Sequence, residues 1–332
     1  MHSKISENEK SMQSLLDNGL LQQILVKSAV DTHIGNYLTE LKVFGSVEIL
    51  TKQERLLLRN RKNKQAQLLA VQKPLSIQDI TLKRIKTLTS SNGGVIRGFC
   101  VTSDKHLLLT HYSESKLSLL DVHGSCLASI PMKYSDSYDV ICLDNDNVLV
   151  TSGNSNYCGI NIIHLPTRKR VKFIKLPGKP YSIASTGEMM FCVVENMGIY
   201  QINKKDYTIS NFVRGNLPYQ SFVAIYEDKI YFSNDTSFVI CTNHSRETLW
   251  KLNYESILNQ PRGATFDHNG NLYITGEYTC NVVVLTNDGK QHREILTSSD
   301  CLNYPSAIFF DRDKNRLIVS NGNEKLFVFK VS

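Results

Sequence analysis

Six carboxylate and amide side chains stand where apolar runs of the sequence end, and both types can bind divalent metal ions. They are Glu195, Asn196, Asn234, Asp235, Glu277 and Asn321. If the runs are equivalent strands of a repeated unit, all six lie on one face. That arrangement would suit a metal-dependent propeller hydrolase. The alternative is that they are polar residues at loop tips, and no Gly-x-Ser-x-Gly motif, Ser-His-Asp order or phosphate-binding glycine loop accompanies them.

The cysteines and histidines form no metal-ligand pattern. The eight cysteines stand more than four residues apart, so none belongs to the Cys-x-x-Cys pair of a zinc module. Several stand in apolar runs, such as Cys100 and Cys192, and we expect reduced, buried thiols. The nine histidines are scattered, and none pairs at i, i+4 around an acid. The sequence therefore predicts no bound metal and no cofactor.

Tyrosine and arginine recur in the loops that would gather on the same face. Interfaces favour both types because each buries a large area and keeps a polar tip. The predicted binding surface consists of Tyr112, Lys116, Tyr138, Tyr157, Tyr181, Tyr219, Arg262, Tyr278 and Tyr304. The alternative for each tyrosine is that it packs its loop onto the body of the protein. We expect the ligand to be a protein partner.

These residues are positioned by a unit that recurs from about Ile96 to Ser332. Its clearest copy spans residues 261–285, with a short strand, a turn containing Gly270, a second apolar strand, a loop and a third strand. The second strands of six copies begin at Leu107, Val148, Met190, Ile230, Leu272 and Leu317. A period of about 42 residues suits four short strands and their turns, which make one propeller blade. The sequence therefore predicts an all-β six-bladed propeller.

The sixth copy ends at Ser332 with its third strand, so one blade lacks its outer strand. Upstream of the first blade, the segment from Ile80 to Leu88 alternates like a strand. Pairing this segment beside the last strand would close the ring and remove two exposed edges. We therefore expect the propeller domain to occupy residues 76–332.

The first part of the chain differs in pattern and charge. Apolar residues spaced three and four apart predict a helical, coiled-coil oligomerisation segment over residues 1–42, and we expect a homo-oligomer. A linker over residues 43–75 begins with a short extended piece and contains a basic run from Lys52 to Lys64. That run is either a solvated linker or a patch for RNA, an acidic partner or nuclear import.

The basic excess belongs to this first part. Residues 1–95 carry 14 Lys and Arg against 8 Asp and Glu, whereas residues 96–332 carry 24 against 23. Because phosphate binding needs clustered basic side chains, the near-neutral propeller favours a protein ligand. RNA binding through the propeller face stays the alternative.

Two features resemble known families. The copy from Pro261 to Leu285 reads Pro-x-Gly-hydrophobic-x-Phe-Asp and then Gly-Asn-Leu-Tyr-hydrophobic-Thr, which resembles an NHL repeat. The order of leucine-rich helix, basic linker and propeller is similar to the C-terminal half of an invertebrate tripartite-motif (TRIM-NHL) protein. That resemblance implies a ubiquitin-ligase system in which the propeller binds the substrate. This sequence has no RING or B-box zinc module, so we expect a non-catalytic recognition scaffold.

The compartment is predicted from two absences in the sequence. The residues from Met1 to Lys10 are polar and charged, unlike a secretory signal. No stretch approaches the roughly 20 apolar residues of a membrane span. We expect a cytoplasmic protein.

Overall fold

The computed structural model describes residues 76–332 apart from 91–93, 112–114, 133–135, 154, 235–236, 254–255 and 323. It also describes two short strands nearer the N-terminus. The chain divides into two units, Met1–Ala70 and Val71–Ser332. Among the described residues, no helix combines the length and apolar character needed to cross a membrane.

The first unit contains one pair of strands, β1 (Leu25–Ala29) and β2 (Ser46–Leu50). They pair antiparallel, with Val26 opposite Ile49, and β-branched residues favour such pairing. β1 is thus a strand inside the segment whose leucine spacing predicts a helix, and β2 overlaps the predicted extended piece. The rest of the predicted coiled-coil segment 1–42 and the basic run lie outside the described residues.

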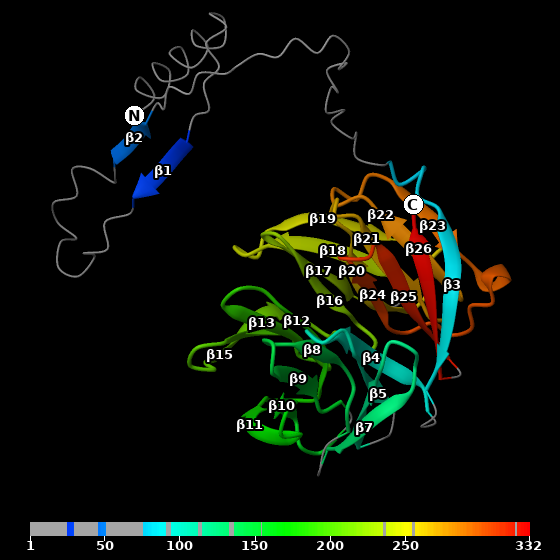
Figure 1. Ribbon diagram of the computed structural model, residues 1–332, viewed down its shortest axis with the longest axis horizontal. Coiled ribbons are helices and arrows are strands. Elements are labelled where there is room, and N and C mark those ends of the chain that lie inside the picture. Colours follow the sequence, from blue (N-terminus) through cyan, green and yellow to red (C-terminus); the bar gives the residue numbers. More distant parts are fainter. Residues whose placement is uncertain are drawn as a thin grey trace, which may run out of the picture. The chain divides into compact units, whose positions relative to one another are not determined.

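The second unit consists of six antiparallel four-stranded sheets, which are the blades of a propeller (Figure 1). Blade 1 contains β4 (Ile96–Val101), β5 (Leu107–His111), β6 (Lys116–Leu120) and β7 (Cys126–Pro131). Blade 2 contains β8 (Val140–Cys142), β9 (Asn147–Thr151), β10 (Gly159–His164) and β11 (Lys169–Lys175). Blade 3 contains β12 (Pro180–Ser185), β13 (Met189–Val194), β14 (Gly198–Asn203) and β15 (Ile209–Arg214).

Blades 4 to 6 repeat the same plan. Blade 4 contains β16 (Val223–Tyr226), β17 (Lys229–Asn234), β18 (Phe238–Asn243) and β19 (Thr248–Asn253). Blade 5 contains β20 (Pro261–Phe266), β21 (Leu272–Gly276), β22 (Asn281–Leu285) and β23 (His292–Leu296). Blade 6 contains β24 (Ile308–Asp311), β25 (Arg316–Asn321), β26 (Lys325–Val331) and β3 (Leu82–Thr89). The six predicted starts of the second strands match the observed starts to within one residue, so the predicted propeller is confirmed.

A strand from before the first blade completes the sixth. β3 pairs antiparallel with β26, and Leu82 lies opposite Val331 while Thr89 lies opposite Lys325. The closing strand predicted at residues 80–88 is therefore confirmed. Because the first blade's β4 also contacts β24 of the last blade, the ring is continuous.

The chain enters and leaves the propeller at one point. The backbone N–H of Thr81 donates to the Ser332 carbonyl at 2.7 Å, and the N–H of Ser332 donates back to Thr81 at 3.0 Å. Ile77 and Ile80 are 1% and 3% exposed and pack into the hydrophobic cluster of blades 5 and 6. The packed body therefore begins before β3.

The first strand of each blade surrounds the centre of the ring, and the fourth lies at the periphery (Figure 1). Second and third strands such as β21 and β22 are buried along their whole length, because neighbouring blades cover both of their faces. Outer strands such as β11 are mostly exposed. This difference explains why the apolar second strands gave the clearest period in the sequence.

A buried hydroxyl fixes the inner strand in five of the six blades. It belongs to the fourth residue from the predicted start of the second strand and accepts a hydrogen bond from an inner backbone N–H at 2.7 to 3.0 Å. The hydroxyls are those of Thr110, Thr151, Ser233, Thr275 and Ser320, and their donors are Gly98, Asp139, Phe222, Gly263 and Ala307. Blade 3 has Val193 at this position.

We call the upper face the end of the propeller that carries the loops between second and third strands and the connections between blades. Residues 155–158, 195–197, 277–280, 215–222 and 297–307 belong to it. The lower face carries the remaining turns. Those candidate metal ligands and predicted binding residues that the structure describes fall at or near the upper face, as the repeat predicts.

Candidate functional site

Two arginines and one glutamate meet where the central channel opens on the upper face. Arg97 Nη1 donates to Glu277 Oε1 at 2.7 Å, and Arg262 Nε donates to Glu277 Oε2 at 2.5 Å. The side chains of Arg97, Arg262 and Glu277 are only 12%, 5% and 6% exposed. β4 and β20 supply the arginines and the loop after β21 supplies the glutamate, so this network joins blades 1 and 5 across the ring.

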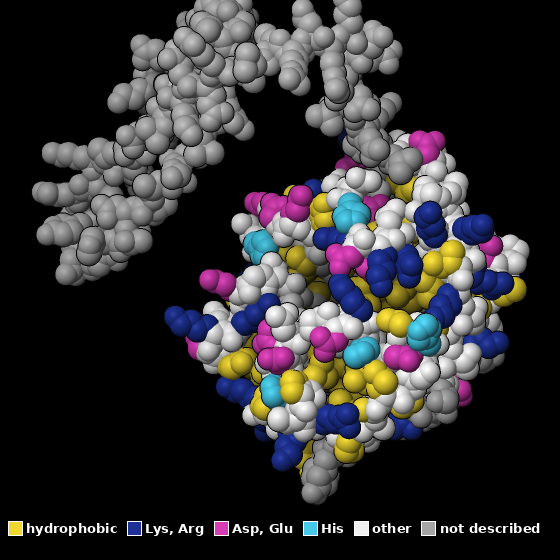
Figure 2. Space-filling view, in the orientation of Figure 1, with side chains coloured by type: hydrophobic (Ala, Val, Ile, Leu, Met, Phe, Trp, Pro, Cys, Tyr) yellow, Lys and Arg dark blue, Asp and Glu magenta, His cyan; other side chains and the backbone are white. Residues whose placement is uncertain are grey.

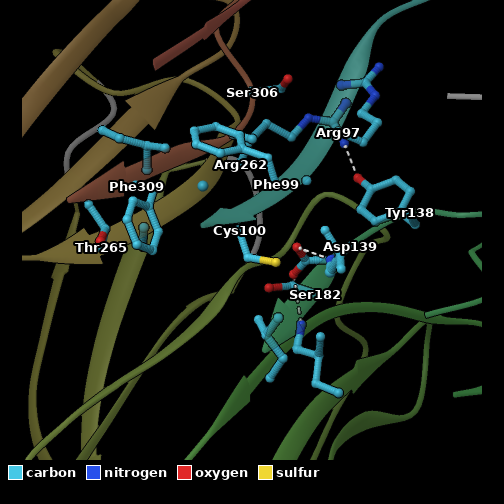
Figure 3. Close-up of a pocket in the computed structure, with 18 of the residues that line it drawn as sticks. Arg97, Phe99, Cys100, Tyr138, Asp139, Ser182, Arg262, Thr265, Ser306 and Phe309 are labelled. Atoms are coloured by element: carbon cyan, nitrogen blue, oxygen red, sulfur yellow. Dashed lines mark hydrogen bonds between the residues drawn. The ribbon is translucent and has the colours of Figure 1, made fainter. Parts of the chain in front are cut away.

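Three tyrosines extend the network across the opening. Arg262 Nη1 donates to the Tyr138 hydroxyl at 3.1 Å, and Figure 3 shows that side chain beside the arginines. The Tyr138 ring meets Tyr181 edge-on at 4.8 Å, and Tyr181 lies 5.6 Å from Tyr219. The Arg262 guanidinium lies 4.9 Å from the centre of the Tyr219 ring, a cation–π contact. Side chains from blades 1, 3 and 5 and from the loops that enter blades 2 and 4 therefore form one connected cluster, which we call the channel network.

The channel network changes the interpretation of four predicted binding residues. Tyr138, Tyr181 and Arg262 are 8%, 4% and 9% exposed, and Tyr219 is partly buried. Their polar groups and rings are directed at one another rather than at solvent. They form the floor of the upper face. For the three tyrosines this corresponds to the alternative in which each packs its loop onto the body of the protein.

The exposed tyrosines lie in the loops around this floor. Tyr157, Tyr278 and Tyr304 are 57%, 57% and 52% exposed, and we call them the rim tyrosines. The rings of Tyr278 and Tyr304 meet edge-on at 6.1 Å. Lys116 begins β6 and is partly buried, and Tyr112 lies outside the described residues.

The candidate metal ligands that the structure describes are not brought together. Both oxygens of Glu277 accept hydrogen bonds from arginines. Asn321 uses its amide within its own loops, accepting from Asn303 and donating to Cys301. Asp235 lies outside the described residues. Within the described ranges, no three His, Cys, Asp or Glu side chains are grouped closely enough to hold a metal ion.

Below the channel network lies a central cavity of about 330 Å³. Asp139 lines it, and the Asp139 carboxylate accepts hydrogen bonds from the backbone of Val140 at 2.9 Å and of Ile183 at 3.0 Å (Figure 3). The second bond joins blade 2 to blade 3. Burial raises the pKa of Asp139 to about 6, although hydrogen bonds from Ile183, Val140 and Ser182 oppose the rise.

The raised pKa of Asp139 predicts a pH dependence of stability. The pKa of Asp139 is higher in the folded protein than in the unfolded chain. Its contribution to the free energy of unfolding is therefore complete below about pH 4 and is lost as the pH rises through about 6. Relative to Asp139→Asn, the wild-type protein should lose about 2 kcal/mol of unfolding free energy between pH 4 and pH 7. Urea unfolding of both proteins across that range measures the difference.

Asp313→Asn provides the control for this titration. The hydrogen bond from Lys105 lowers the pKa of the exposed Asp313. The difference in unfolding free energy between wild type and Asp313→Asn should therefore change with pH in the opposite direction to the difference for Asp139→Asn. The prediction would be contradicted if the difference in unfolding free energy between wild type and Asp139→Asn stayed constant from pH 4 to pH 7.

Comparison with known proteins defines the fold. No protein-family model matches the chain, and no curated protein sequence matches it. Solved structures do match. A Bacteroides thetaiotaomicron protein of unknown function is 14% identical with a TM-score of 0.62, and the match covers 76% of each chain. The chain is a six-bladed β-propeller.

Two further structures of this propeller type are lyases by name. Virginiamycin B lyase from Staphylococcus aureus is 14% identical with a TM-score of 0.58, over 76% of this chain and 99% of the lyase. A streptogramin B lyase is 13% identical with a TM-score of 0.58, over 76% and 98%. At such identities the likeness extends to the fold alone. It shows neither membership of the TRIM-NHL family nor an enzymatic activity.

Sequence reasoning missed the partners of the channel network. The predicted binding surface does not include Arg97, and Glu277 is expected from the sequence only as a candidate metal ligand. The hydroxyl at the fourth position of the second strands was also missed, although aligning the six copies displays it. An arginine at the start of inner strands β4 and β20 was the available signal, since such positions face the channel.

Proposed function

We propose that this protein is a non-catalytic recognition scaffold whose upper face binds a protein partner. The observation that carries the proposal is the pairing of a fixed floor with an exposed aromatic rim. The channel network is largely buried and its members contact one another, whereas the rim tyrosines expose more than half of their surface. Rigid tyrosines on a prearranged surface suit protein binding because little side-chain entropy is lost.

The resemblance to TRIM-NHL proteins supports a finer form of the proposal. In that form, the propeller holds a substrate of a ubiquitin-ligase system in the cytoplasm. The segment 1–42 joins copies of the chain, which would raise the avidity of several upper faces for one partner.

The rim tyrosines supply the test of protein binding. For a partner identified by crosslinking to the wild-type propeller, Tyr278→Ala and Tyr304→Ala should each weaken binding by about 2 kcal/mol, roughly 30-fold in Kd. Isothermal titration calorimetry measures the change. The control is Val171→Ala in β11, because Val171 is 59% exposed but belongs to an outer strand. Equal Kd values for wild type and both tyrosine variants would reject the rim as the binding surface.

A second candidate, RNA binding, is favoured by one outer strand rather than by the channel. Arg262 is buried against Glu277 and does not reach a phosphate. In β11, however, Lys169, Arg170, Lys172 and Lys175 are all exposed, and no Asp or Glu occurs in residues 147–187. Elsewhere on the face shown in Figure 2, basic and acidic side chains are interspersed.

A salt-dependent gel shift with single-stranded RNA distinguishes the two candidates. RNA binding would fall steeply with salt and be lost in Lys169→Glu/Lys175→Glu, while Tyr278→Ala would leave it unchanged. If no gel shift is seen at micromolar protein concentration, RNA binding is rejected and protein recognition is retained. The third candidate, a metal-dependent hydrolase, requires a bound divalent ion, which elemental analysis of the purified protein detects.

A further inference from the structure

Two cysteine side chains meet inside the ring. Cys100 belongs to β4 and Cys142 ends β8, so they lie on the inner strands of neighbouring blades. Their sulfur atoms are 3.5 Å apart, and Cys142 Sγ also lies 3.4 Å from the Val101 carbonyl oxygen. Cys100 is 5% exposed, and Cys142 is partly exposed. The side chain of Cys100 projects into the space between the inner strands (Figure 3).

Both cysteines line the central cavity of about 330 Å³. A second cavity of about 480 Å³ is lined partly by the same residues, including Val101, Ile141 and Phe309, and it continues to lower-face residues such as Lys105. A small solute that enters at the lower face therefore finds a path towards the two sulfur atoms. The channel network covers the opposite end.

The environment makes the two thiols unequal. The hydrogen bond between the two sulfur atoms lowers the pKa of Cys142, and the same contact, together with burial, raises the pKa of Cys100. The thiolate is the nucleophilic form of cysteine. Cys142 is therefore the thiol prepared to attack, and Cys100 stands next to it as the resolving thiol.

We propose that Cys100 and Cys142 form a modification site, at which a hydroperoxide converts the two thiols into a disulfide between blades 1 and 2. The Cys142 thiolate attacks one peroxide oxygen and breaks the O–O bond, which gives a sulfenic acid and hydroxide. Cys100 then transfers its proton and attacks Cys142 Sγ, which forms the S–S bond and expels the oxygen as water. Two thiols are oxidised, and one hydrogen peroxide becomes two waters.

The geometry suits this product. A disulfide has an S–S length of about 2.05 Å, so the sulfur atoms need to approach by about 1.5 Å, which side-chain rotation can supply. The two residues are 42 positions apart, one repeat of the propeller. The new bond would close a loop of one blade and restrict the unfolded chain. Exposed Cys126 and Cys301 stand outside this pair and serve as controls.

The test treats the full chain with a few equivalents of hydrogen peroxide and then alkylates the remaining thiols. Mass spectrometry should find that two of the eight cysteines have become unreactive and that peptides containing Cys100 and Cys142 are joined. Dithiothreitol should reverse the change. The oxidised protein should melt about 5 °C or more above the reduced protein. Cys126→Ser and Cys301→Ser should leave all of these results unchanged.

Two variants assign the roles within the pair. Cys142→Ala should abolish the crosslink, and in Cys100→Ala the reaction should stop at a sulfenic acid on Cys142 that dimedone captures. Oxidation confined to Cys126 and Cys301, or progression of Cys142 to a sulfinic acid without a crosslink in the wild type, would overturn the proposal. If one alanine variant fails to fold, the crosslinked peptide of the wild type still decides it.

Discussion

A chain from which residues 80–88 are deleted is expected to lose the cooperative unfolding of the propeller. β3 supplies the outer strand of blade 6, and its loss leaves β26 with an unpaired edge. Buried Ile80 and Leu88 are lost as well, and each contributes about 1.5–3 kcal/mol through burial. Adding about 0.5–1.5 kcal/mol for each strand hydrogen bond gives a loss comparable to the whole stability of a typical domain.

Circular dichroism during heating measures this effect. The matched control is a chain that begins at residue 76, which keeps β3 and should melt as the full chain does. A deletion variant that melts within about 2 °C of the control would show that β3 is dispensable. If closure of the ring is the cause, adding a peptide of residues 76–90 to the chain that lacks residues 80–88 should restore part of the thermal transition.

Glu277→Gln is expected to cost about 3–5 kcal/mol of unfolding free energy, because it leaves the buried Arg97 and Arg262 guanidinium groups facing a neutral amide. The amide also replaces one acceptor oxygen with a donor, so one arginine hydrogen bond is lost. Denaturant unfolding monitored by tryptophan fluorescence measures the change. Since this network joins blades 1 and 5, its loss should also loosen the upper face.

The exposed pair of Lys105 and Asp313 is the control for Glu277→Gln. Its N–O distance of 2.5 Å equals that of Arg262 and Glu277, but its side chains are 48% and 69% exposed. Asp313→Asn should therefore change the unfolding midpoint very little, because water solvates both charges. Equal destabilisation by the two substitutions would contradict the assignment of a buried network.

The fold could be predicted from the sequence because its signals are local. The second strands repeat their apolar pattern within each copy, and the missing outer strand after Phe329 pointed to the segment at Ile80. The side-chain site could not be predicted in the same way. Whether Tyr138 is buried depends on Arg262, which is 124 residues away in the sequence and belongs to another blade. Both residues belong to the predicted binding surface because of their residue types. The contact that buries them forms only when the ring is closed.

The single point at which the chain enters and leaves the propeller has a mechanical consequence. Thr81 and Ser332 lie side by side at one end of the β3–β26 pair. A force that separates these residues would load the hydrogen bonds of that pair one after another, like a zipper, rather than all at once in shear. Under tension the ring should therefore open at blade 6 at low force, although the same strand pair is expected to contribute strongly to its thermal stability.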